Sequence, residues 1–102
     1  MSRNAWADRQ KVQLSEYVRA LKQNPCTDCG IMYPYPAMDF DHCRGQKDMD
    51  ISKMCRRPVT WERLMEELAK CDLVCANCHR VRTWQRAVRA AGWDGELSEL
   101  QV

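Results

Sequence analysis

The sequence lacks any long hydrophobic run. No stretch approaches the ~20 consecutive apolar residues of a membrane-spanning helix, and no apolar signal segment opens the chain. These absences favour a cytoplasmic protein with no membrane partner. Internal repeats and low-complexity segments are also missing. The seven cysteines are an odd number, so a disulfide framework is disfavoured and reduced thiols are expected.

With 102 residues, the chain is expected to form one domain. A domain of this size has a thin hydrophobic core, and a bound metal ion is one way to add stability. The net charge of +2 is unevenly distributed. Residues 73–93 contain four arginines and no acid, whereas residues 94–102 contain three acids and no base. The first stretch suits a polyanion such as nucleic acid, and the second would repel one.

The most specific pattern is a pair of C-x-x-C units. One unit contains Cys26 and Cys29, and the other contains Cys75 and Cys78. Each presents two sulfurs from one tight turn, and two such turns can close a tetrahedral zinc site. Small buried cysteines or a metal-free redox pair are the alternative interpretations. We predict a structural Zn2+ on these four cysteines and assign no role to Cys43, Cys55 and Cys71.

The N-terminal part of the chain predicts a helix followed by a strand. Residues 5–23 place apolar side chains at the spacing of one helical face, namely Leu14, Tyr17, Val18 and Leu21. Asn24-Pro25 should end this helix. After the first cysteine pair, the proline-rich residues 33–36 predict an extended connector. Residues 38–42 then alternate between apolar and acidic positions, which predicts a short strand ending at His42.

Three helical segments are expected further along. Ser52 is a candidate cap for a short turn within residues 51–57, and Thr60 is the expected N-cap of a helix that ends near residue 70. The predicted buried face of that helix is Trp61, Leu64, Met65 and Leu68. The last helix is expected over residues 79–91, because no helix breaker occurs before Gly92. Its predicted core face is Val81, Trp84 and Val88, and its arginines are expected on the opposite side.

The two histidines of the chain stand beside chemically useful neighbours. Asp41-His42 ends the predicted strand, and His79 opens the basic helix directly after the last zinc cysteine. Closing the zinc site would bring these three residues into one neighbourhood. A carboxylate and an imidazole can hold a divalent cation, while a second imidazole can accept a proton from water near neutral pH. Phosphodiester hydrolysis needs both functions. Purely structural histidines near zinc are the alternative.

These residues resemble a known family, the small zinc-knuckle HNH endonucleases of bacteriophages and bacteria, also called His-Me finger nucleases. The resemblance spans about residues 26–83 and rests on three motifs. They are Cys26-x-x-Cys29-Gly30, then Asp39-Phe40-Asp41-His42-x-x-Gly45-x-Lys47, and finally the run from Lys70 to Arg80, KCDLVCANCHR.

The resemblance implies an α+β fold with a ββα-metal core, in which a two-stranded hairpin and a helix hold one catalytic divalent ion. By position, Asp41 and His79 would be the ligands of that ion, which is expected to be Mg2+ or Mn2+, and His42 would be the general base. The four cysteines would hold a separate zinc. The expected organisation is an N-terminal helix over residues 1–24, a nuclease domain over residues 25–91 and an acidic tail over residues 92–102.

One feature departs from the family pattern. Many members place an asparagine several residues before the second cysteine pair, where it fixes the loop of the base histidine. Between His42 and His79 this chain has a single asparagine, Asn77, which lies inside the second C-x-x-C unit. Either Asn77 takes that role, or another polar residue near positions 70–72 does. Asn77 is therefore a candidate catalytic residue, with a simple turn residue as the alternative.

We predict an endonuclease that hydrolyses double-stranded DNA, nicking one strand at a time in the cytoplasm of a bacterial or phage-infected cell. Phosphate contacts are expected from five basic residues. They are Arg80, Arg82, Arg86, Arg89 and Lys47. The alternatives are a non-catalytic nucleic-acid-binding zinc module, or an adaptor within a larger phage or bacterial complex. A homodimer or a phage or bacterial protein partner is compatible with each.

Overall fold

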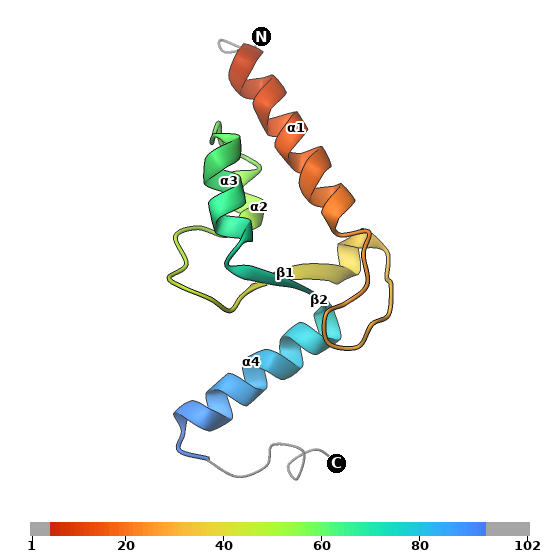
Figure 1. Cartoon of the computed structure of the whole chain (residues 1–102), viewed down its shortest axis with the longest axis vertical. Helices are drawn as coiled ribbons and strands as arrows, with labels where there is room; N and C mark the ends of the chain where they lie inside the picture. Colours follow the sequence, from red (N-terminus) through yellow and green to blue (C-terminus); the bar gives the residue numbers. More distant parts are fainter. Residues whose placement is uncertain (1–4, 94–102) are drawn as a thin grey trace.

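The computed structural model describes residues 5–93 and has the expected α+β class (Figure 1). Within these residues the elements follow in the order α1 (Ala5–Leu21), the short 3-10 helix η1 (Tyr35–Ala37), β1 (Met38–His42), α2 (Ile51–Met54), α3 (Trp61–Leu68), β2 (Cys71–Cys75) and α4 (Ala76–Ala90). No helix among them is both long and apolar enough to cross a membrane. The acidic residues predicted to form a tail, 94–102, lie outside the described residues.

The sheet consists of β1 and β2, which pair antiparallel. In this register Asp41 lies opposite Asp72, and His42 lies opposite Cys71. The predicted strand at residues 38–42 is thereby confirmed. The preceding connector is not wholly extended as predicted, because Pro36 lies within the η1 turn, where its fixed φ is compatible with helical geometry.

The two faces of the sheet meet different partners (Figure 1). Helices α1, α2 and α3 lie on one side, and α4 projects from the other. Successive side chains of a strand point to opposite faces. Phe40 and His42 accordingly contact the side of α1–α3, while Asp39 and Asp41 contact α4.

The main core lies between α1, α2, α3 and the sheet. Leu14 and Val18 of α1 form one buried stripe, and Asn24 donates a side-chain hydrogen bond to the Leu21 carbonyl where the helix ends. The buried members of this core are Leu14, Val18, Ile51, Met54, Cys55, Leu64 and Cys71. Each large apolar side chain removed from water contributes about 1.5–3 kcal/mol. The N-terminal helix is thus packed against the rest of the domain.

Helix α3 begins as predicted, because the Thr60 hydroxyl accepts a hydrogen bond from the Arg63 amide at 3.2 Å. Its predicted buried face is partly wrong. Trp61 and Met65 are exposed, and the residues that α3 buries are Leu64 and Glu67. The short helix α2 also differs from expectation, since its N-cap is Asp50 and Ser52 lies inside the helix.

Helix α4 starts at Ala76, three residues earlier than predicted, because Cys75 caps it by accepting the Cys78 amide on its sulfur. The predicted core face is wrong. No residue of α4 is buried, and both Val81 and Trp84 are exposed. The helix contacts the strands through its first turns and then extends away from the body (Figure 1). Neither core cluster of the described residues includes Val81, Trp84 or Val88.

Candidate functional site

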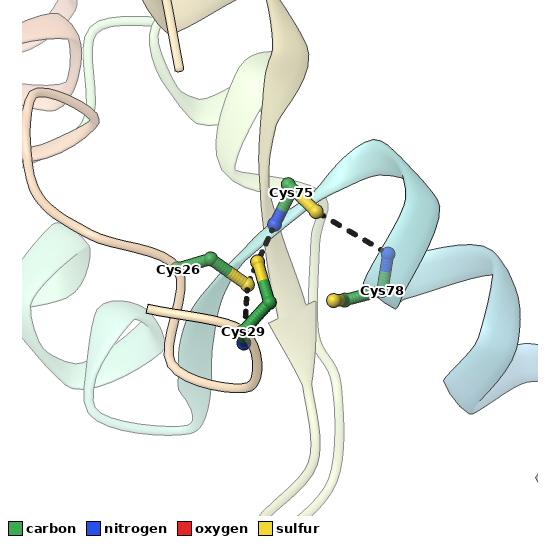
Figure 2. A group of neighbouring side chains, drawn as sticks. All are labelled: Cys26, Cys29, Cys75 and Cys78. Carbon is green, nitrogen blue, oxygen red and sulfur yellow. Dashed lines mark hydrogen bonds between the residues drawn. The ribbon is translucent and has the colours of Figure 1, made fainter. Parts of the chain in front are cut away.

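Four cysteines meet where the first C-x-x-C turn, β2 and α4 come together (Figure 2). Cys26 and Cys29 come from the loop after α1, Cys75 ends β2, and Cys78 lies in the first turn of α4. Their sulfurs all lie within 4.8 Å of one another. In a tetrahedral zinc site with Zn–S bonds of ~2.3 Å, the sulfurs lie about 3.8 Å apart. A small contraction would therefore accommodate one metal ion such as Zn2+.

Local backbone contacts hold this cluster together. The amide of Thr27 donates to the Leu73 carbonyl at 2.8 Å, and this bond holds the first C-x-x-C turn against β2. Gly30 has φ of 74°, a conformation that residues with a Cβ rarely adopt, and its amide donates to the Cys26 carbonyl at 2.9 Å. The C-x-x-C turn thus closes on itself and presents both sulfurs to the same side.

The electrostatics of the cluster favour a cation. Burial would raise the pKa of the Cys26 thiol, but amides of Cys29, Cys75 and Asp28 donate to its sulfur and lower the pKa overall. Burial and contacts with the other three cysteines raise the pKa of Cys78 instead. Ionising neighbouring thiols places like charges side by side, a conflict that a cation between the sulfurs would offset. Metal binding relieves that conflict, because Zn2+ binds the deprotonated form.

Asp41 and His79 approach each other on the α4 side of the sheet. Oδ1 of Asp41 lies 3.4 Å from Nε2 of His79. Adjacent ligands of an octahedral Mg2+, with bonds of ~2.1 Å, lie about 3 Å apart. One divalent ion can therefore contact both atoms after a small adjustment. No third acidic, histidine or cysteine ligand joins them within the described residues, where the cysteine cluster is the single group of three or more.

Asp41 is buried and surrounded by guanidinium groups. Arg86 donates to both of its oxygens, at 2.8 and 2.6 Å, and Arg82 donates to Oδ2 at 2.8 Å. The hydrogen bonds from Arg86, opposed by burial and reinforced by Arg82, lower the pKa of Asp41 to about 2. Asp41 is therefore an ionised carboxylate at neutral pH and can pair with a guanidinium group or with a metal ion.

Arg82 and Arg86 differ in their surroundings. Arg82 is largely buried and bridges three carboxylates, because it also binds Asp28 at 2.6 Å and Asp72 at 3.1 Å. It neutralises the acidic pair that the strand register brings together. The Arg86 side chain is about half exposed, at 49%. Arg86 can therefore leave Asp41 at lower cost than Arg82 can.

His79 is held from its other side by Asp39. Nδ1 of His79 lies 2.9 Å from Oδ2 of Asp39. A carboxylate oxygen accepts, so Nδ1 carries the hydrogen of this bond. The remaining nitrogen, Nε2, is the one that faces Asp41. A histidine that binds a metal usually has its second nitrogen held by such a partner.

His42 lies on the opposite face and contacts a different acid. Its Nε2 is 3.0 Å from Oε2 of Glu67, whose side chain is completely buried in α3. The described residues provide no hydrogen-bond partner for Nδ1 of His42. Consecutive residues of β1 thus direct one acidic and one imidazole group to opposite sides of the strand.

One open pocket of about 460 Å³ reaches both faces at the edge of β1. Its lining includes Asp39, Asp41, His42, His79 and Arg86. Lys47 also lines it and forms an ion pair with Asp50. The expected neighbourhood of Asp41, His42 and His79 is therefore present, and the catalytic roles assigned to these residues stay predictions.

The remaining predicted site residues lie elsewhere. Asn77 is exposed in the first turn of α4, and its side chain has no hydrogen-bond partner among the described residues, so nothing links it to His42. Arg80 and Arg89 are exposed on α4. Together with Arg82, Gln85 and Arg86, Arg89 forms a shallow basic surface along this helix.

Sequence reasoning missed two acids of this site, Glu67 and Asp39. Glu67 lies in a polar segment typical of a solvated helix face. The signal that could have found it is the placement of Lys70 at i+3 and Arg63 at i−4, where both can neutralise a buried acid. Asp39 was assigned no role of its own. Its position two residues before Asp41 signalled that both point to the same side of β1.

Comparisons of this chain with protein-family models, with curated proteins and with solved structures find no match. A function for the chain therefore has to be inferred from its own residues and their arrangement.

Proposed function

We propose that the protein is a metal-dependent endonuclease that hydrolyses phosphodiester bonds of double-stranded DNA. The observation that supports this most strongly is the 3.4 Å approach of Asp41 Oδ1 to His79 Nε2 in a pocket that His42 also lines. An acid, a ligand imidazole and a second imidazole are the groups that metal-assisted hydrolysis requires.

The chain order around the pocket fits the ββα-metal arrangement that the sequence resemblance implies. β1 carries Asp41 and His42, β2 pairs with it, and α4 follows β2 directly and carries His79. Helices α2 and α3 are an insertion between the two strands. The zinc cluster fixes the junction of β2 with α4, so it positions His79 from one end while Asp39 holds it from the other.

The donor set suits a small divalent cation. Asp41 supplies an ionised oxygen and His79 a nitrogen, and the pocket is open enough for water and phosphate oxygens to supply other ligands. When bound, Mg2+ or Mn2+ would stabilise the negative charge that develops on the phosphate and on the leaving oxygen. Asp41 and His79 would fix the position of this ion, and Asp39 orients His79.

His42 acts as the general base in this proposal. Its Nε2 is engaged by Glu67, so its Nδ1 is the nitrogen that accepts the proton of the attacking water. A cation on Asp41 would take the place of Arg86, whose long and half-exposed side chain could then contact a phosphate. Further phosphate contacts come from Lys47 at the pocket and from Arg80 and Arg89 along α4. Arg82 keeps its ion pairs with the three carboxylates.

The experiment is nicking of supercoiled plasmid by the zinc-loaded protein with Mg2+, Mn2+ or no added cation. We expect nicking that requires the divalent ion and falls by at least ~100-fold in His42→Ala, since general bases contribute about 10²–10⁴. His42→Ala should keep its zinc and its affinity for DNA. Equal nicking by both proteins, or none by either with any cation, would remove the proposal.

One observation favours a second function. The ion pairs between Asp41 and Arg86 satisfy that carboxylate without any cation, as expected in a zinc module that binds DNA without cutting it. The two functions differ in cation binding at the pocket. A binding module would show DNA binding that ignores Mn2+, whereas the nuclease would bind Mn2+ through Asp41 and His79.

A further inference from the structure

Glu67 is an unusual residue for its position. It lies in the last turns of α3, its side chain is completely buried, and it is the one acid in the described chain with no exposed surface at all. Charged side chains are almost never fully buried unless they are paired. The Glu67 carboxylate has five hydrogen-bonding or ion-pair partners in the structure.

The partners divide between the two carboxylate oxygens. Oε2 accepts from the Asp48 amide at 3.0 Å and lies 3.0 Å from His42 Nε2. Oε1 accepts from Lys70 at 3.1 Å and from Arg63 at 3.5 Å. The Met49 amide is a further donor to the carboxylate. Burial would raise the pKa of Glu67, but these donors outweigh it and lower the pKa to about 2.

An ionised carboxylate has no hydrogen to donate. The contact between Oε2 and His42 Nε2 is therefore a bond in which the histidine donates. A neutral imidazole carries one hydrogen, so a ring that donates from Nε2 has its lone pair on Nδ1. Lys70 and Arg63 balance the negative charge from the far side, which keeps Glu67 an acceptor.

We propose that Glu67 is the positioning residue of His42: it fixes the imidazole as the Nε2–H tautomer and so leaves Nδ1 as the basic nitrogen in the pocket. Glu67 thereby does what the missing asparagine was expected to do, from the helix before β2 rather than from the knuckle. The inference deepens the proposed nuclease function and rests on it for the catalytic meaning of Nδ1. The tautomer itself does not depend on any activity.

Two substitutions separate orientation from simple support of the fold. In Glu67→Gln, the fixed Asp48 amide favours an amide oxygen at the Oε2 position, where it still accepts from His42. The amide nitrogen then takes the Oε1 position, and Lys70 and Arg63 lose an acceptor there but keep Asp48 as a partner. Glu67→Met keeps the volume and removes every acceptor. The exposed neighbour Glu66 provides a matched control, Glu66→Gln, on the same helix. All variants are compared only after zinc content and circular dichroism match the wild type.

The first readout is the nitrogen-15 spectrum of the His42 ring in zinc-loaded protein at about pH 8.5, well above the ordinary range of histidine titration. We expect the Nε2–H tautomer in the wild type, in Glu66→Gln and in Glu67→Gln, and a mixture of tautomers in Glu67→Met. A wild-type ring protonated on Nδ1, or an unchanged spectrum in Glu67→Met, would overturn the inference. If Glu67→Met does not fold, the wild-type spectrum still decides.

The second readout is plasmid nicking. We expect Glu67→Met to lower kcat by at least ~10-fold with KM for DNA and Mn2+ affinity unchanged, because a base in the wrong tautomer is a poor base although the geometry survives. Glu67→Gln should retain most of the activity. Unchanged kcat in folded Glu67→Met would also contradict the inference. If no protein nicks DNA while the spectra are as expected, the proposed function fails and the tautomer assignment stands.

Discussion

The cysteine cluster and the Asp41–His79 pair are two candidate cation sites of different kinds. The cluster offers four soft ligands, and no hydrogen bond or ion pair links its sulfurs to an arginine or lysine among the described residues. The pKa of Cys26 is lowered and that of Cys78 is raised. The pair offers one oxygen and one nitrogen, and two arginines already neutralise the carboxylate: Arg86 bonds both of its oxygens, including the Oδ1 that faces His79, and Arg82 bonds Oδ2. We therefore expect the first site to depend on its ion for stability, whereas Asp41 in the second site is already paired and would bind an ion only in exchange for Arg86.

The largest expected effect is loss of the cysteine site. Cys75→Ser removes a buried sulfur of the cluster at the junction of β2 and α4, while the serine hydroxyl can still cap the helix. We expect loss of zinc and of the cooperative thermal transition, because structural Zn2+ supplies about 10–16 kcal/mol of apparent binding energy in small domains. Zinc stoichiometry and circular dichroism measure both. Cys43→Ser, at an exposed cysteine outside the cluster, should keep its zinc and melt like the wild type.

Acid should reveal how Glu67 stabilises the fold. Its folded pKa of about 2 lies below the ordinary 4.5, so its contribution is present above pH ~4.5 and is lost as pH falls toward 2. The full contribution is about 3 kcal/mol. Denaturant unfolding of wild type and Glu67→Gln, both zinc-loaded at pH 7, should differ by about that amount there, and the difference should shrink as the pH falls from about 4.5 toward 2. A difference that stays constant with pH would contradict this explanation.

Removing Asp39 should weaken the second site without touching the first. Asp39→Ala leaves His79 Nδ1 without its acceptor, so the ring is free to turn its nitrogen away from Asp41. Loss of such a partner typically lowers metal affinity by about 10–100-fold. Calorimetric titration with Mn2+ measures the change, and zinc content should be unaltered. Equal Mn2+ affinity in Asp39→Ala and wild type would exclude a role for Asp39 in orienting His79.

The smallest expected effect concerns the competing arginine. Arg86→Met frees Asp41 from an ion pair whose arginine is half exposed, and such pairs contribute about 0.2–1 kcal/mol. Mn2+ should then bind up to about five-fold more tightly, while DNA affinity decreases. Arg89→Met on the same helix is the control, with an unchanged Mn2+ affinity and a comparable loss for DNA. Weaker Mn2+ binding in Arg86→Met would show that the arginine does not compete.

The elements that the sequence predicts well depend on short-range patterns. The strand of residues 38–42, the Thr60 cap and the end of α1 before Asn24-Pro25 each follow from a few neighbouring residues. The cysteine cluster belongs with them, because each C-x-x-C turn fixes two sulfurs locally.

The features that could not be predicted depend on what an element packs against. Periodicity assigned Val81 and Trp84 to a core, but α4 extends beyond the sheet, and neither residue joins a core cluster of the described chain. Glu67 reads as a solvated residue until α3 is placed against His42 and the chain at Asp48. Pairing of Asp41 with Arg82 and Arg86 likewise requires the orientation of α4 on β1, which no local pattern contains.

The most direct test of the central claim is the electron spin-echo spectrum of Mn2+ bound to the zinc-loaded protein. Coordination by His79 predicts a nitrogen-14 coupling that persists in His42→Ala and disappears in His79→Ala, with Mn2+ affinity reduced in Asp41→Asn. Absence of stoichiometric Mn2+ binding to the wild type, or a nitrogen coupling that survives in His79→Ala, would contradict a cation held between Asp41 and His79.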